Sequence, residues 1–254
     1  MKAVKKQNKL VELNFDTLIQ YYNFDRELKM LIFDAIERIE IGFRTKLIYY
    51  LSHEISPWWF EDFTIFKNKN EYLRTLKAID NELIKTKESY ITEYLNKYKD
   101  IGNRPPAWKT IEIASLGNIS KLYGNLLPII KSKDIIAAEF GTVNHTYFPS
   151  WIQSITQIRN VCAHHGLLWN KKINCSPKLL KKPPYPWLTV EPIKDDFSKL
   201  YIYLCCMKYL LNVIYPKNSF TNDLDSLFIK YSSIDKNSIG IRHNWKNEPL
   251  WLTT

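Results

Sequence analysis

The chain has 254 residues, of which 45% are hydrophobic, and a formal net charge of +10 at pH 7. This length and composition favour a folded chain with a proper core, organised as one large domain or two small ones. Only 7 glycines occur, which argues against an open α/β sheet or a β architecture, because both spend glycine on tight turns. The excess of lysine and arginine favours a polyanionic partner such as nucleic acid, although a lysine-rich genome would produce the same charge.

The cysteines and the absence of long apolar runs indicate the compartment. Cys205 and Cys206 lie side by side in an apolar run, where they are expected to be buried hydrophobes, and with Cys162 and Cys175 they do not suggest a disulfide scaffold. The first residues, "MKAVKKQNKLVELNF", begin with basic side chains but lack the apolar run of a signal peptide, and no later stretch is apolar enough to span a membrane. We therefore expect a cytoplasmic protein that is not bound to a membrane.

Helical periodicity dominates the first half of the chain. Apolar residues recur at three- and four-residue spacing over residues 25–53, with charges on the opposite face, which predicts a long amphipathic helix that ends before Pro57. A charged helix is expected from about residue 69 to 99, where "DIGNRPPAW" breaks it. Shorter helices are predicted over residues 108–131 and 132–140, the second stopped by Gly141, and a further helix over residues 147–168 carries Pro149 in its first turn.

The second half contains an irregular segment between helices. Five prolines between Pro177 and Pro192 predict an irregular excursion over residues 171–194, whose length suggests a function or a partner. Helices are expected over residues 196–214 and 220–231, followed by a tryptophan-rich tail, "IGIRHNWKNEPLWL". Without internal repeats or linkers, the chain is predicted to be all-α and to form a single domain over residues 1–254, with a core at about 24–215 and a C-terminal extension over 216–254.

The stretch "RNVCAHHGLLWN", residues 159–170, carries the chemistry. A core-facing stripe is expected from Trp151, Ile155, Ile158, Cys162 and Leu168. This stripe leaves Arg159, Asn160 and His164 to point elsewhere. Asn160 and His164 are four residues apart and share a face, while Arg159 lies about 140° from His164 around the helix axis. A long arginine side chain can still swing beside the imidazole.

An arginine and a histidine that converge on one phosphate are the minimum equipment for cleaving RNA without a metal. The histidine serves as general acid or base, the arginine clamps the phosphate, and the 2′-hydroxyl of the RNA is the nucleophile. A structural alternative exists, in which His164 and His165, next to Gly166, simply end a helix whose C-terminal dipole favours cations. Spacing alone favours this structural alternative.

The same stretch resembles the signature RNxxAHHxxLWN of the Abi (abortive infection) family, in its AbiD/AbiF-like group, and the RxxxxH motif of HEPN-domain ribonucleases. Two more stretches fit that family in the same order: "FDRELKMLIFDAIERIEIGFRTKL" (Phe24–Leu47) and "PPAWKTIEIASLGNISKLY" (Pro105–Tyr123). The resemblance covers roughly residues 23–170 and reverses the preference for a mere helix end.

The resemblance implies an HEPN-like helical bundle and a homodimer in which two copies of the motif line one cleft. It also implies defence against phage through RNA cleavage, and members of the AbiF-like group are associated with a structured noncoding RNA. By motif position, it assigns Arg159 and His164 as catalytic and Asn160 as the polar residue that orients them. His165 also belongs to the pattern, but the pattern does not fix its role. The pair Glu40 and Arg44 in the first block is expected to be a surface bridge or to hold the motif helix.

Basic and aromatic residues mix in three regions, as in RNA-binding surfaces. One region is the lysine-rich stretch from Lys67 to Lys87, and the other two are the proline-rich excursion and the tail. The candidate RNA-binding residues of these last two are Lys178, Lys181, Lys182, Tyr185, Trp187, Arg242, Trp245 and Lys246. For each region singly, a solvated charged face with aromatic rings anchored in the core is the better interpretation. Together with the net charge, we expect at least one of them to contact RNA.

Neither a metal nor a cofactor is expected. Cys162, His164, His165 and Cys175 match no zinc-ligand spacing. The sequence also lacks the glycine-rich phosphate loop of an NTPase and the GxSxG turn of a serine hydrolase. Two hypotheses remain: a metal-independent endoribonuclease with a composite Arg/His site at a homodimer interface, or a non-catalytic RNA-binding protein that forms a ribonucleoprotein with a structured noncoding RNA.

Overall fold

The structure is a computed structural model that describes residues 15–99, 104–164 and 166–252. Within these residues it contains ten α-helices and no β-strand, which confirms the prediction of an all-α protein. No helix in this part of the chain is long and apolar enough to cross a membrane. Three parts of the chain discussed above lie outside the described residues: its basic start, the first four residues of the stretch "DIGNRPPAW", and His165.

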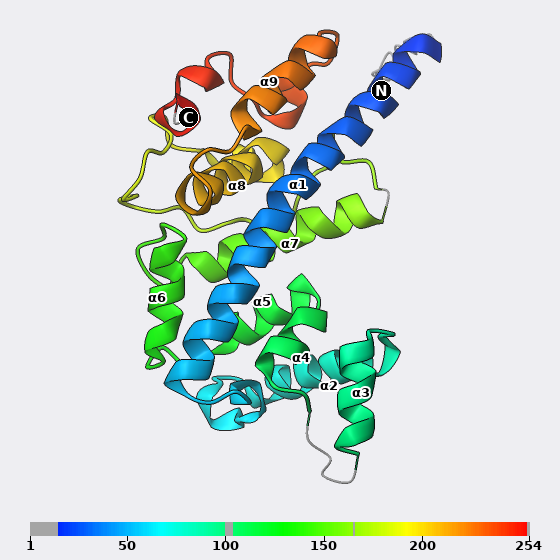
Figure 1. The fold of residues 1–254 in the computed structure, drawn as a ribbon. Coiled ribbons are helices and arrows are strands. Elements are labelled where there is room, and N and C mark those ends of the chain that lie inside the picture. Colours follow the sequence, from blue (N-terminus) through cyan, green and yellow to red (C-terminus); the bar gives the residue numbers. More distant parts are fainter. Residues whose placement is uncertain (1–14, 100–103, 165, 253–254) are drawn as a thin grey trace, which may run out of the picture.

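Helix α1 (Phe15–Glu54) runs from one end of the molecule to the other and contacts most of the other helices (Figure 1). It begins at Phe15 rather than near Asp25, because its first turns are supported by distant segments. Tyr21 stacks on Trp169 with ring centroids 5.1 Å apart, and Phe24 packs against Phe228 and Tyr231. Local periodicity does not contain these tertiary contacts.

Four helices gather beside the C-terminal half of α1: α2 (Lys69–Lys85), α3 (Ser89–Lys97), α4 (Ala107–Ile113) and α5 (Leu116–Asn125) (Figure 1). The predictions of one helix over residues 69–99 and one over 108–131 are therefore wrong, since each is interrupted. Thr86 has extended backbone angles, and its hydroxyl accepts a hydrogen bond from the amide of Glu88. At the second break, the Glu82 carboxylate accepts the Ser115 amide at 3.1 Å, which replaces the bond that a continuous helix would make.

Beside the other half of α1 lie α8 (Leu200–Ile214), α9 (Phe220–Lys230) and the short α10 (Pro249–Leu252), while α7 (Phe148–Ala163) crosses the middle (Figure 1). Helix α6 (Lys131–Glu139) packs against the C-terminal half of α1, where Glu139 contacts Lys46 and Tyr50. Helix α6 ends at Glu139, and Gly141 follows two residues later with a φ of 75°, which suits glycine. A Cβ atom at this position would lie 2.7 Å from a methyl carbon of Val213 in α8, so the close approach also requires glycine.

Residues 171–193 form no regular element, in keeping with their prolines. The segment is nevertheless fixed to the protein, because Leu180, Trp187 and Leu188 are buried. The buried apolar side chains of this segment, of the helices and of the tail form one continuous cluster. Helix α7 crosses the centre of this core, so its two ends reach different sides of the molecule.

Candidate functional site

The motif residues lie at the C-terminal end of α7. The helix starts with Pro149 in its first turn and is anchored by Trp151, Ile155, Ile158 and Cys162, all buried as predicted. It ends at Ala163 rather than near Leu168. The His164 amide donates to the Asn160 carbonyl at 3.0 Å, and the Gly166 amide donates to Val161, five residues back, a bond that closes helix C-termini.

Asn160 and His164 are exposed, and their four-residue spacing places them on the same face of the helix end. Arg159 is half-buried on a different side, where it lines a groove along α1. Among the described residues, the side chains of Arg159 and His164 make no hydrogen bond or ion pair, so both are available to a ligand or a partner. His164 can therefore cap the end of the helix, as the structural alternative has it, and still be available for chemistry, because its side chain is exposed there.

Two residues of α1 clamp the chain that follows the motif. Asp25 is only 3% exposed, and one of its carboxylate oxygens accepts the amides of Leu168 and Trp169 at 2.7 and 2.9 Å. The other oxygen forms an ion pair with Lys29 at 2.7 Å, and Lys29 also donates to the Gly166 carbonyl at 3.2 Å. Hydrogen bonds from a charged side-chain pair to backbone groups are strong, so this pair fixes the loop firmly. The stretch "GLLWN" is therefore held against the first block of the sequence.

Sequence reasoning missed this clamp. Asp25 was expected at the very start of a helix, where a carboxylate is normally solvated, and only its distance of four residues from Lys29 hinted at a pair. The expected pair of Glu40 and Arg44 does form. However, Arg44 donates to the carbonyls of Ile111 and Glu112 at the end of α4, so this pair holds α4 rather than the motif helix.

The groove beside Arg159 has a volume of about 780 Å³ and runs along an exposed face of α1. Its apolar side chains include Met30 and Ile41, which are 61% and 58% exposed. Carboxylates line it as well: Asp34, Glu37, Glu40 and Glu112 outnumber the arginines, Arg44 and Arg159. This combination of apolar and acidic side chains suits a protein surface better than a polyanion.

The candidate RNA-binding residues of the proline-rich segment divide into two groups. Lys178, Lys181 and Lys182 are exposed, as is Tyr185. Trp187 instead packs against Trp151 and Tyr209, with both ring-centroid distances at 5.5 Å. Its ring belongs to the core in this conformation and offers no free face for a base.

The tail residues are likewise engaged within the protein. Trp245 is 3% exposed and packs edge-on against Trp251 at 4.8 Å. Arg242 donates to the Val190 carbonyl at 2.9 Å and pairs with Asp196 at 3.0 Å, and Lys246 pairs with Asp225 at 2.8 Å. These contacts attach the tail to neighbouring segments, so the exposed lysines of the proline-rich segment are the better candidates for RNA.

Metal ligation finds no support in the cysteines and histidines that the structure describes. Cys162, Cys205 and Cys206 are buried and Cys175 is half-buried, and all four are free thiols. Burial raises the pKa of the Cys162 thiol to about 12, so it stays protonated. No group of three or more potential ligands comes together in the described part of the chain.

Comparison with known proteins gives one result. The family model described as Abi-like protein matches residues 1–170, which is two thirds of the chain and ends at the last residue of the stretch "RNVCAHHGLLWN". The match spans the helices α1 to α7 and both halves of the clamp. The searches of curated proteins and of solved structures found no match.

Proposed function

Because this chain belongs to the Abi-like protein family, which implies a role in abortive-infection defence against phage, we propose that it is an endoribonuclease of the HEPN type. The observation that carries this proposal is the end of α7: an exposed His164, an exposed Asn160 on the same face, and an unpaired, half-buried Arg159 on another side of the same helix end, which the Asp25–Lys29 clamp fixes. Positioned, unpaired catalytic groups on a rigid element are what a reaction needs.

The reaction follows from these groups. The 2′-hydroxyl oxygen of the RNA attacks the adjacent phosphorus, and the bond from phosphorus to the 5′ oxygen breaks. The proton of the 2′-hydroxyl passes to a neutral imidazole, and the leaving 5′ oxygen takes a proton from an imidazolium. The products carry a 2′,3′-cyclic phosphate and a 5′-hydroxyl. Arg159 binds the scissile phosphate and offsets its developing charge, and Asn160 orients the groups.

A second copy of the chain supplies the second imidazole in this proposal. The reaction uses one histidine as base and another as acid, whereas one chain presents one His164 at the motif. The groove beside Arg159 offers exposed apolar side chains along α1, at residues 30, 33 and 41. Packing of this face against a partner would bring two copies of Arg159 and His164 toward one cleft. His165 belongs to the same stretch, and the proposal gives it no separate step.

The test is the chemistry of the products. The wild-type protein is expected to release RNA fragments with 2′,3′-cyclic phosphate ends, without added metal. The His164→Ala variant is expected to lose roughly 10²- to 10⁴-fold in the rate of cleavage, the usual contribution of a general acid or base. Its fold should remain intact, because His164 is exposed. His53→Ala, another exposed histidine at the far end of α1, serves as the matched control.

A second function is favoured by a separate observation, the exposed lysines of the proline-rich segment. They support a non-catalytic protein that holds a structured noncoding RNA in a ribonucleoprotein. A single discrete RNA that copurifies with the protein and stays uncut would favour this function. Full cleavage activity in a folded His164→Ala protein would remove His164 from the mechanism.

A further inference from the structure

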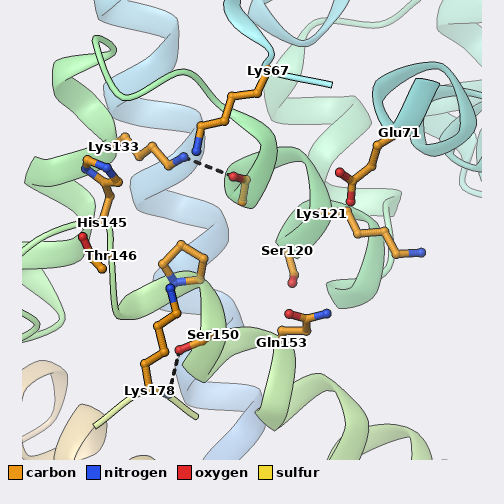
Figure 2. Close-up of a pocket in the computed structure, with 12 residues that line it drawn as sticks. Lys67, Glu71, Ser120, Lys121, Lys133, His145, Thr146, Ser150, Gln153 and Lys178 are labelled. Carbon is orange, nitrogen blue, oxygen red and sulfur yellow. Dashed lines mark hydrogen bonds between the residues drawn. The ribbon is translucent and has the colours of Figure 1, made fainter. Parts of the chain in front are cut away.

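A second polar site lies at the other end of α7. A pocket of about 480 Å³ opens between the C-terminal end of α5, the start of α6 and the first turn of α7, and it is closed by the segments that carry Lys67 and Lys178 (Figure 2). Figure 2 shows the side chains of Lys67 and Lys133 meeting above the pocket, with His145 beside Lys133. Neither the motif nor the groove beside Arg159 includes any of these residues.

The lining of this pocket has the chemistry of a phosphate site. Lys67, Lys121, Lys133 and Lys178 line it, against one carboxylate, Glu71. No phenylalanine, tyrosine or tryptophan is among the described residues that line it, and its one aromatic ring, the His145 imidazole, is bonded to Asp134 at 2.7 Å. The pocket thus offers cations for a phosphate but no large ring on which a base could stack. The pocket therefore fits the backbone of a nucleic acid and not its bases.

Two buried side chains point into this pocket and are not satisfied by the protein. Ser120 is 7% exposed, its hydroxyl faces the pocket, and it has no hydrogen-bond partner among the described residues (Figure 2). Lys133 is 1% exposed and donates to the carbonyls of Gly124 and Leu126 at 3.1 and 2.5 Å. An ammonium group has three N–H donors, so these two acceptors leave one for a ligand.

The charged form of Lys133 is destabilised when no anion is bound nearby. Its burial, together with the nearby positive charge of Lys67, lowers the pKa of Lys133 to about 7. An anion placed between the two ammonium groups would satisfy the free donor and offset their repulsion. A phosphate would therefore stabilise this pair of lysines more than it would stabilise exposed lysines on an open surface, whose charges are already solvated.

The pocket and the motif are connected along one face of α7. Gln153 lines the pocket, and Gln157, Asn160 and His164 follow it at intervals of four, three and four residues. This spacing keeps all four on one face of a helix. Each of these side chains is exposed. From Gln153 to His164 the helix rises by about 16 Å, a distance that a few nucleotides of single strand can span.

We propose that this lysine pocket is a phosphate subsite for RNA: it binds a backbone phosphate of the strand whose scissile phosphate lies at His164, and the strand follows the polar face of α7 between the two. The position of the scissile phosphate rests on the proposed function, whereas the binding of a backbone phosphate in the pocket does not. The same chemistry would accept the phosphate of a free nucleotide, so the test must separate the two sources.

The test measures binding without cleavage. A 2′-O-methylated oligouridylate lacks the nucleophile and reports affinity alone. The Lys67→Gln/Lys178→Gln double variant is expected to bind it about tenfold more weakly, and to flatten the dependence of log Kd on log salt by about 0.7 for each lost phosphate contact. Both lysines are exposed, so the fold should tolerate their replacement. Lys194→Gln/Lys236→Gln removes the same charge outside the pocket and should bind like the wild type.

Three results overturn the subsite. One is equal affinity in the pocket variant and the wild type. Another is an equal loss in the control variant, which would reduce the effect to net charge. The third is binding of inorganic phosphate or uridine monophosphate that only the pocket variant loses, with oligonucleotide affinity unchanged, which would assign the pocket to a free nucleotide. The 2′-O-methylated oligonucleotide cannot be cut, so a failure of the catalytic proposal would appear in the cleavage assay with His164→Ala and would leave the comparison of pocket and control variants unaffected.

Discussion

The two ends of α7 are built by opposite means. The C-terminal end presents Asn160 and His164 to solvent. The chain that follows it is held by the buried Asp25 carboxylate, which accepts hydrogen bonds from two backbone amides. The N-terminal end lines a pocket that is also lined by four lysines from separate segments of the chain. One end is held in place and presents the motif side chains, and the other is a concentration of positive charge. The difference suggests that chemistry and RNA anchoring are separable properties of one helix.

The surroundings of the two ends also differ in charge. The groove beside Arg159 is lined by carboxylates and apolar side chains, whereas the pocket near Gln153 is lined by lysines. A polyanion is attracted to the second, whereas the carboxylates of the first oppose it except at the unpaired Arg159. We therefore expect RNA to approach along the face of α7 that includes Gln157, and a second copy of the chain to approach along α1.

The largest effect on stability is expected at the clamp of the C-terminal end. Replacing Asp25 with alanine leaves the amides of Leu168 and Trp169 without an acceptor and Lys29 without its partner. Loss of one member of a mostly buried charged pair should cost about 3 kcal/mol in the free energy of unfolding. Asp34→Ala is the matched control, because Asp34 forms an exposed pair with Arg38 at the same spacing on α1 and should cost less than about 0.5 kcal/mol.

Urea unfolding followed by circular dichroism measures both variants. If Asp25→Ala and Asp34→Ala are equally stable, the clamp does not hold the motif. A folded Asp25→Ala protein should also cleave RNA more slowly than wild type, since the helix end would lose its fixed position.

A smaller effect is expected on assembly. Ile41→Asp places a carboxylate in the groove, where acidic side chains already lie, and should weaken a dimer at least about tenfold. Cleavage should fall in parallel and return at high protein concentration. Ile229→Asp, on an exposed position of α9 away from the groove, should change neither. Sedimentation velocity measures the state of association, and a wild-type monomer with a concentration-independent specific rate would contradict the composite site.

The smallest effect is a dependence on pH at the lysine pocket. Because the pKa of Lys133 is about 7 in the folded protein, its charge is lost as the pH rises from 6 to 8, and affinity for the 2′-O-methylated oligonucleotide should fall severalfold. The charged groups around it are Lys67, Lys121, Lys178, Glu71, Asp134 and His145. Histidine is the type among them that ordinarily changes charge in this range. His145→Gln should keep the dependence, and Lys133→Met should remove it.

The stability of the protein should respond to pH with the opposite sign. The unfolded chain keeps Lys133 protonated up to about its ordinary pKa of 10.5, whereas the folded chain releases the proton near 7. The unfolded state therefore binds more protons between these values, and the contribution of Lys133 to stability increases as the pH rises through them. Urea titrations at pH 7 and 9 should show a smaller increase for Lys133→Met than for the wild type.

The same contrast explains how much could be predicted from the sequence. The core-facing stripe of α7 was predictable, because it is local in sequence: Trp151, Ile155 and Ile158 are buried as the periodicity requires, although the helix ends at Ala163 rather than near Leu168. The lysine pocket was not predictable, because Lys67, Lys133 and Lys178 come from three segments that only the tertiary fold brings together. The break at Ser115 was missed for the same reason, since Glu82 caps it from another helix, whereas the break at Thr86 involves a local bond between its hydroxyl and the Glu88 amide.

The measurement that tests the central claim most directly is a crystal structure of the protein with the 2′-O-methylated oligouridylate. The account predicts one backbone phosphate within hydrogen-bond distance of Lys67 and Lys178, and the strand running past Gln157 to a second phosphate beside His164. An oligonucleotide bound elsewhere, with the lysine pocket empty and His164 away from any phosphate, would contradict it.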